Sequence, residues 1–141
     1  MAHGNSKRAT WDDLREYDVV LTTYGTLGAE YTRLVKFEEE SKRNGITNHD
    51  PKQMAKDFPF LGPNSRFYRV ILDEAQCIKN KTTKAAASAY RLTALTRFCL
   101  TGTPMMNNIT ELYSLIKFLR IRPYSSWTSF VKVCISGIPY F

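Results

Sequence analysis

Two adjacent acids end a short apolar run in the stretch FYRVILDEAQCIKN, residues 67–80. The run Val70-Ile71-Leu72 leads directly into Asp73 and Glu74. Hydrolysis of a nucleoside triphosphate needs one carboxylate to hold a magnesium ion and another group to orient the attacking water. Because adjacent residues of a strand point in opposite directions, Asp73 suits the first role and Glu74 the second. The alternative is that both acids are simply solvated residues that follow a strand.

The elements that would position these acids begin with three short apolar runs. The run DVVLTT is β-branched and lacks the polar alternation of a half-exposed strand, which is typical of parallel sheets covered on both faces. A second apolar run is followed at once by Asp73, and a third run is followed at once by Gly102. The sequence therefore predicts three strands, at 18–23, 67–72 and 97–101.

Helical spacing follows the second and third predicted strands. Alanine and leucine recur at helical intervals after residue 84, which predicts a helix over about 82–95 with Asn80 or Thr82 as its cap. Asn108 and Glu111 match a capping box that opens a further helix. The apolar face of this further helix comprises Ile109, Leu112, Leu115, Ile116 and Leu119.

Strands thus alternate with helices, which predicts an α/β fold with a parallel sheet flanked by helices. In such sheets ligands bind beyond the carboxyl ends of the strands. Polar side chains follow each predicted strand, in the stretches 22–24, 73–74 and 101–104. We therefore expect these three stretches to converge on one edge of the sheet.

The other segments are less regular. Residues 1–16 are polar, and a helix is expected to begin within 29–38. Charge, Asn, Gly and Pro dominate 38–66, which predicts a surface insertion whose end, at 58–61, packs on the body of the domain. Residues 131–141 form a divergent tail.

Composition narrows the possible partners. The 141-residue chain has a formal charge of +7, which favours polyanions because neutralised phosphates release counterions, although basic surfaces also serve solubility. No apolar run approaches the roughly 20 residues that span a bilayer, so no membrane partner is expected. The N-terminal stretch lacks a secretory apolar region, which makes a cytosolic or nuclear protein the default. The three cysteines include no CxxC pair that would indicate zinc.

Three motifs carry a resemblance to a known family. The stretch VILDEAQ resembles the Walker B box (motif II), LTGTPMMNN resembles motif III, and DVVLTTYGTL resembles motif Ib of the Swi/Snf-type helicase-like ATPases of superfamily 2. The order of the motifs is the family's order, and the resemblance covers roughly 17–130. It implies part of the N-terminal ATP-binding lobe, which is RecA-like. RNA helicases of the DEAD-box type, a further alternative, usually carry Ser-Ala-Thr in place of TGTP.

The resemblance implies a role for each acid and its neighbours. Asp73 would coordinate magnesium, and Glu74 would activate water. Gln76 would link the nucleotide to motif III. Most of the family has His at this position, and Gln is similar to the RING-finger-bearing remodeller and DNA-translocase branch. The motif III residues that would couple the nucleotide state to movement between lobes are Thr101, Gly102 and Thr103.

The resemblance also implies a DNA-binding stretch. Thr22, Thr23 and Tyr24 would hold a DNA strand by its phosphates, a contact that positions the protein without reading sequence. Lys79 and Asn80 would add a basic contact. Each of these residues has a plain alternative, since threonines favour strand ends and most lysines are solvated.

Two expected parts of such an enzyme are missing. None of the seven glycines is followed by Lys, so the chain contains no GxxxxGK[ST] phosphate loop. The resemblance places that loop upstream of motif Ib and a second lobe after residue 130. We therefore expect an internal part of a longer, nuclear ATPase that uses ATP and Mg²⁺ to translocate on double-stranded DNA and to remodel nucleosomes or strip DNA-bound proteins. The chain alone is expected to be inactive. The alternative is a non-catalytic fragment that binds DNA or a partner protein.

Overall fold

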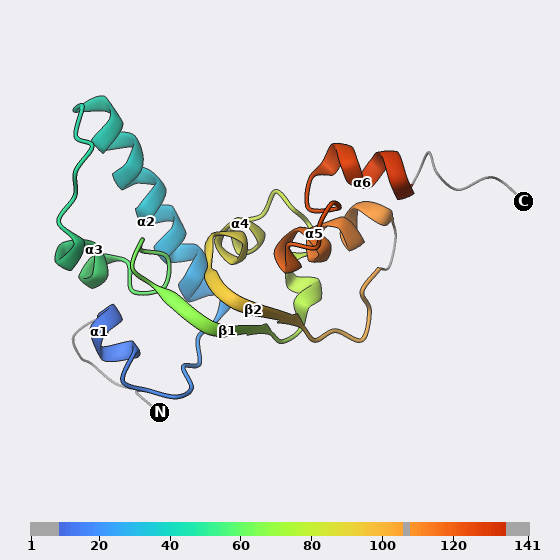
Figure 1. The fold of residues 1–141 in the computed structure, drawn as a ribbon, viewed down its shortest axis with the longest axis horizontal. Helices are drawn as coiled ribbons and strands as arrows, with labels where there is room; N and C mark the ends of the chain where they lie inside the picture. Colours follow the sequence, from blue (N-terminus) through green and yellow to red (C-terminus); the bar gives the residue numbers. More distant parts are fainter. Residues whose placement is uncertain (1–8, 106–107, 135–141) are drawn as a thin grey trace, which may run out of the picture.

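The computed structural model of the protein describes residues 9–105 and 108–134. At its centre lies a sheet of two parallel strands, β1 (Arg66–Leu72) and β2 (Thr93–Cys99). Figure 1 shows α2, α4 and α5 gathered along one side of this sheet. Along the chain, β1 is followed by a helical crossover and then by β2. This order confirms the predicted α/β fold, in which a parallel sheet is flanked by helices.

The crossover from β1 to β2 contains a short turn of 3₁₀ helix, η1 (Ala75–Ile78), and α4 (Lys84–Arg91). The sequence predicts that this helix runs to about residue 95 and that the next strand occupies 97–101. In the structure Leu92 is already extended, with ψ at 135°, and β2 begins at the next residue. Pairing with β1 along the whole of β2 outweighs the helical spacing of the sequence, since local propensity yields to tertiary contacts.

The predicted strand at 18–23 is wrong, because the sheet of the described residues contains β1 and β2 alone. The segment leads into α2 (Tyr24–Arg43), which therefore begins earlier than expected. Thr23 ends the extended run, since its side chain caps this helix. Val19 and Leu21 are 75% and 89% exposed. A strand needs a hydrogen-bonded neighbour, and this segment has none in the described part of the chain.

The segment 38–66, predicted to be irregular, is partly helical. Its first residues extend α2, and α3 (Pro51–Asp57) begins after Asp50, whose side chain accepts the N–H of Lys52. Proline suits the first position of a helix, where its missing N–H has no partner to lose. The end of the segment packs on the domain as predicted, since Phe58 and Leu61 are buried.

A buried carboxylate joins α2 to the end of this segment. Oε1 of Glu30 accepts the backbone N–H groups of Phe60 at 2.9 Å and of Leu61 at 2.7 Å. Glu30 is only 3% exposed. Burial raises the pKa of this carboxyl, while the two N–H groups act in the opposite direction. The contact fixes the chain that enters β1 against α2.

The main apolar cluster packs β1 and η1 against α4 and α5 (Ile109–Leu119), with Ile78 and Phe118 almost fully buried. Asn108 caps α5 as predicted, by accepting the N–H groups of Thr110 and Glu111. The buried face of α5 is rotated from the predicted stripe. It is made of Glu111, Tyr113, Ser114, Leu115 and Phe118.

Two short helices complete the described structure. They are α1 (Trp11–Leu14) and α6 (Trp127–Cys134). Phe130 of α6 is fully buried against Tyr113 of α5, with ring centroids 5.2 Å apart. Across residues 9–105 and 108–134, no helix is long and apolar enough to cross a membrane.

Candidate nucleotide site and its link to a DNA-binding segment

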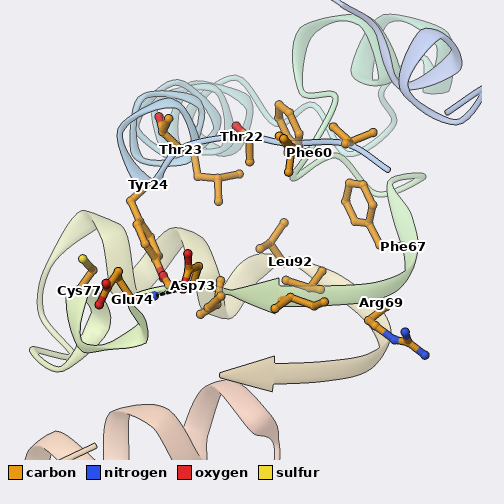
Figure 2. A pocket seen from close by; sticks show the side chains of 16 residues that line it. Thr22, Thr23, Tyr24, Phe60, Phe67, Arg69, Asp73, Glu74, Cys77 and Leu92 are labelled. Atoms are coloured by element: carbon orange, nitrogen blue, oxygen red, sulfur yellow. Dashed lines mark hydrogen bonds between the residues drawn. The ribbon is translucent and has the colours of Figure 1, made fainter. Parts of the chain in front are cut away.

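An open cavity of about 610 Å³ lies along the edge of β1 (Figure 2). The segment 20–24 forms one wall, and β1 with the residues that follow it forms the other. Asp73 and Glu74 lie at one end of the cavity, and the ring of Phe67 lies at the other. The cavity therefore brings two of the predicted polar stretches, 22–24 and 73–74, to opposite sides of one space.

Asp73 follows the last residue of β1, and its side chain is exposed. Its Oδ1 accepts the backbone N–H of Glu74 at 2.9 Å. The hydrogen bonds of the described residues include none to Oδ2 of this exposed side chain. Mg²⁺ is commonly held by one or two carboxylates together with water and substrate phosphates, so Asp73 fits this ion. No group of three or more His, Cys, Asp or Glu that would hold a metal by protein ligands alone occurs within 9–105 and 108–134.

Glu74 has a left-handed backbone, with φ at 48° and ψ at 49°. This conformation is costly for a residue with a Cβ atom. It turns the chain from β1 into η1, and Figure 2 shows the side chains of Asp73 and Glu74 pointing in different directions. That separation suits one acid for a metal and the other for water, as the sequence predicts.

Gln76 connects Glu74 to the end of β2. Its Nε2 donates a hydrogen bond to Oε2 of Glu74. Its Oε1 accepts the hydroxyl proton of Thr101 at 2.7 Å. The backbone N–H of Thr103 donates to the same hydroxyl oxygen at 3.2 Å. We name the side chains of Glu74, Gln76 and Thr101 the relay, because they link the two strand ends.

The backbone holds the two ends of the relay side by side. Leu100 donates its N–H to the carbonyl of Leu72 at 2.8 Å, and Ala75 donates its N–H to the carbonyl of Leu100 at 2.9 Å. The parallel pairing therefore continues beyond the strands into the turn after Glu74. Gly102, the remaining residue of this group, is exposed, and a Cβ atom there would meet nothing within 4 Å.

Thr22 and Thr23 line the wall of the cavity that faces β1 (Figure 2). Both residues are exposed. The Thr23 hydroxyl accepts the N–H of Thr26 and lies 3.0 Å from the Thr26 hydroxyl. The two threonines therefore stand at the N-terminus of α2, where backbone N–H groups favour anions such as phosphate.

Tyr24 turns toward the acids instead. Its hydroxyl donates a hydrogen bond to the main-chain oxygen of Asp73 at 2.8 Å, from the opposite wall of the cavity. The sequence gives no signal for this contact, because the two residues are 49 positions apart.

Lys79 and Asn80 have structural contacts of their own. Nζ of Lys79 lies 3.9 Å from Oε1 of Glu111, an acid of α5 that the sequence suggests only as part of a cap. Oδ1 of Asn80 accepts the N–H and the hydroxyl proton of Thr82 at 3.0 and 2.7 Å. The cap of α4 is Thr83, not Asn80 or Thr82. Both residues thus help to shape the chain between η1 and α4.

Comparison with known proteins identifies the family. The SNF2-related domain family matches residues 2–138, almost the whole chain. The chain belongs to the SNF2-related family. An ATP-dependent helicase of Schizosaccharomyces pombe is 44% identical over 131 residues, which are 92% of this chain and 12% of that protein.

Other SNF2-related proteins are similar over the same region. The ATP-dependent helicase ULS1 of Saccharomyces cerevisiae is 40% identical over 133 residues, 86% of this chain and 8% of that protein. The DNA repair protein RAD5A of Arabidopsis thaliana is 36% identical over 131 residues, 93% of this chain and 11% of that protein. The chain therefore spans 8% to 12% of the length of these relatives.

Proposed function

We propose that residues 17–130 are part of the ATP-binding lobe of a DNA-dependent ATPase that moves along double-stranded DNA. In this proposal Asp73 holds Mg²⁺ and Glu74 orients the attacking water. Gln76, Thr101, Gly102 and Thr103 couple the nucleotide state to the second lobe. The relay carries the proposal, because it connects the predicted water-orienting acid with the end of β2 through hydrogen bonds between side chains.

Two of the proposed DNA-contact residues, Thr22 and Thr23, line the other wall of the same cavity. Thr22 and Thr23 offer hydroxyls and the N-terminus of α2 to phosphates, and Lys79 and Asn80 add a contact beyond η1. The charge of +7 is consistent with a phosphate-rich partner. Relatives named as DNA repair proteins and helicases favour double-stranded DNA, nucleosomes or DNA-bound proteins as targets, and the nucleus as the location.

The proposal assigns hydrolysis to the complete protein that carries this chain. ATP binding needs backbone N–H groups that cradle the phosphates and a lysine that reaches them, and the chain contains no GxxxxGK[ST] sequence. Asp73 by itself offers one carboxylate to a magnesium ion that ATP would normally bring. The 141 residues alone are therefore proposed to be inactive.

Nucleotide-dependent DNA binding tests this function against the non-catalytic alternative. The complete protein is titrated onto a fluorescent DNA duplex with and without Mg²⁺ and a non-hydrolysable ATP analogue, and anisotropy reports the affinity. The proposal expects an affinity that changes with the nucleotide. An affinity that does not change with Mg²⁺ and the analogue would favour the alternative, a non-catalytic fragment that binds DNA.

A further inference from the structure

The hydroxyl of Tyr24 ties the N-terminus of α2 to the carboxyl end of β1. Its oxygen donates a hydrogen bond, 2.8 Å long, to the main-chain oxygen of Asp73. Figure 2 shows the ring reaching from α2 to the turn that carries Asp73 and Glu74. The two threonines proposed to hold DNA immediately precede Tyr24 in the chain. One side chain thus spans the distance between the proposed DNA segment and the proposed metal ligand.

The Tyr24 ring is held in place by packing. It lies against the buried cluster that contains Leu72, Ala75 and Ile78. The hydroxyl acts as the donor of this hydrogen bond, because the main-chain oxygen of Asp73 can only accept. Packing holds the ring and a hydrogen bond holds the hydroxyl, so the side chain is fixed at both ends between α2 and the turn after β1.

The same hydrogen bond argues against a DNA contact through the Tyr24 hydroxyl. A phosphate oxygen accepts hydrogen bonds and cannot donate one, and a tyrosine hydroxyl has a single proton to give. In the structure that proton is directed to the Asp73 carbonyl. The proposed phosphate contacts of the segment 22–24 are left to its threonines and its backbone N–H groups, and the Tyr24 hydroxyl has a different task.

We infer that Tyr24 is a positioning residue, which transmits the movement of the segment that holds DNA to the backbone of Asp73. The inference rests on the proposed function. Because Oδ1 of Asp73 accepts the N–H of Glu74, a shift of the Asp73 main chain changes the positions of both acids together. DNA bound at Thr22 and Thr23 would in this way adjust the carboxylate that holds Mg²⁺.

The test is DNA-stimulated ATP hydrolysis by the complete protein with Tyr24→Phe, which keeps the ring and its packing but removes the hydroxyl. Tyr17→Phe is the matched control, because Tyr17 is 68% exposed and precedes the same segment without a contact to the acids. Steady-state rates are measured against the concentration of a DNA duplex. The rate of Tyr24→Phe at saturating DNA is expected to fall about five- to tenfold, at an unchanged half-saturating DNA concentration. Tyr17→Phe is expected to match the wild type.

Each other outcome has a definite meaning. A higher half-saturating DNA concentration with a normal saturated rate would make Tyr24 a DNA contact, and would overturn the inference. An equal loss with and without DNA would mean that the hydroxyl supports the site independently of DNA, and unchanged kinetics would mean that the hydrogen bond has no effect. Both of these results also overturn the inference. Wild-type hydrolysis that ignores DNA would instead overturn the proposed function, and this result is obtained before any substitution is made.

Discussion

The hydroxyl of Thr101 donates a 2.7 Å hydrogen bond to Oε1 of Gln76. Through this bond the residue that follows β2 is joined to the turn that follows β1. Gln76 in turn donates to the carboxylate of Glu74, so the orientation of that acid depends on a residue of the other strand end. The relay should be sensitive to the loss of either bond, because the amide nitrogen and the amide oxygen of Gln76 each have one partner within the relay.

Loss of the hydrogen bonds of the relay should lower ATP hydrolysis by the complete protein. Gln76→Leu removes both bonds, and Thr101→Val removes the bond to Thr101 alone. Gln76→Leu and Thr101→Val each remove a polar group while keeping a similar shape, and each is expected to reduce kcat about tenfold. The double variant should be little worse than Gln76→Leu alone, since the two residues act as one unit. Steady-state ATP hydrolysis by the three variants checks this. Fully multiplicative losses would show that the two side chains act independently.

The left-handed backbone of Glu74 predicts a difference in stability between two substitutions at this position. Glu74→Gly should be more stable than Glu74→Ala by about 1 kcal/mol, because glycine adopts positive φ without the Cβ penalty that alanine keeps. Both variants lose the bond to Gln76, so their difference isolates the backbone. Urea denaturation of the chain measures the two free energies of unfolding. Equal values would show that φ near 48° carries no strain here.

The buried carboxylate of Glu30 should be replaceable by an amide but not by alanine. Glu30→Gln keeps an oxygen that accepts the N–H groups of Phe60 and Leu61, whereas Glu30→Ala leaves both groups unpaired and should cost about 2 kcal/mol. Urea denaturation of the two variants measures the difference. A Glu30→Ala chain as stable as the Gln variant would show that solvent replaces the carboxylate.

Glu30 also predicts a pH dependence. Its pKa is raised in the folded chain above the ordinary value of 4.5, so between the unfolded and folded values the folded state binds more protons. The contribution of Glu30 to the free energy of unfolding should therefore fall as pH rises through this window. Glu30→Gln should remove that fall. The difference between the free energies of unfolding of wild type and variant, measured from pH 4 upward, isolates the contribution of Glu30. A difference that grows in favour of the wild type as pH rises would contradict the shift.

The cysteines should differ in their reaction with iodoacetamide. Burial raises the pKa of the Cys99 thiol to about 11, whereas Cys77 is exposed beside the acids. Since the thiolate is the reactive form, Cys77 should be alkylated at least about tenfold faster than Cys99 at pH 8. Mass spectrometry of peptides from a Cys134→Ser variant follows the two sites separately. Equal rates would mean that β2 opens to solvent on the time scale of the reaction.

The elements that the sequence predicts best are those with strong local signals. The run that ends at Asp73 appears as β1, and Asn108 caps α5 where expected. Apolar periodicity and a capping side chain act within a few residues, so they can be seen in the sequence. The segment 18–23 has an equally good strand pattern but no neighbour to pair with among the described residues.

The candidate site could be predicted in part. The acids and the residues after β2 are predicted from the positions of the strand ends and from motif resemblance. The structure joins one of the acids, Glu74, to Gln76 and Thr101 through hydrogen bonds. The contacts of Tyr24 with Asp73 and of Lys79 with Glu111 join residues far apart in the chain. Such contacts depend on how helices pack, and spacing in a single sequence does not encode them.

The proposed role of Glu74 in a DNA-dependent ATPase is tested by ATP hydrolysis of the complete protein. Rates of the wild type and of Glu74→Gln are compared with and without a DNA duplex. The substitution keeps the shape of the side chain and removes the charge that would orient water. We expect DNA to stimulate hydrolysis by the wild type, and we expect the rate to fall about 100-fold or more in Glu74→Gln while DNA binding is retained. Equal rates in the two proteins would contradict the role of Glu74. Hydrolysis by the 141-residue chain alone would contradict the proposal that this chain is inactive by itself.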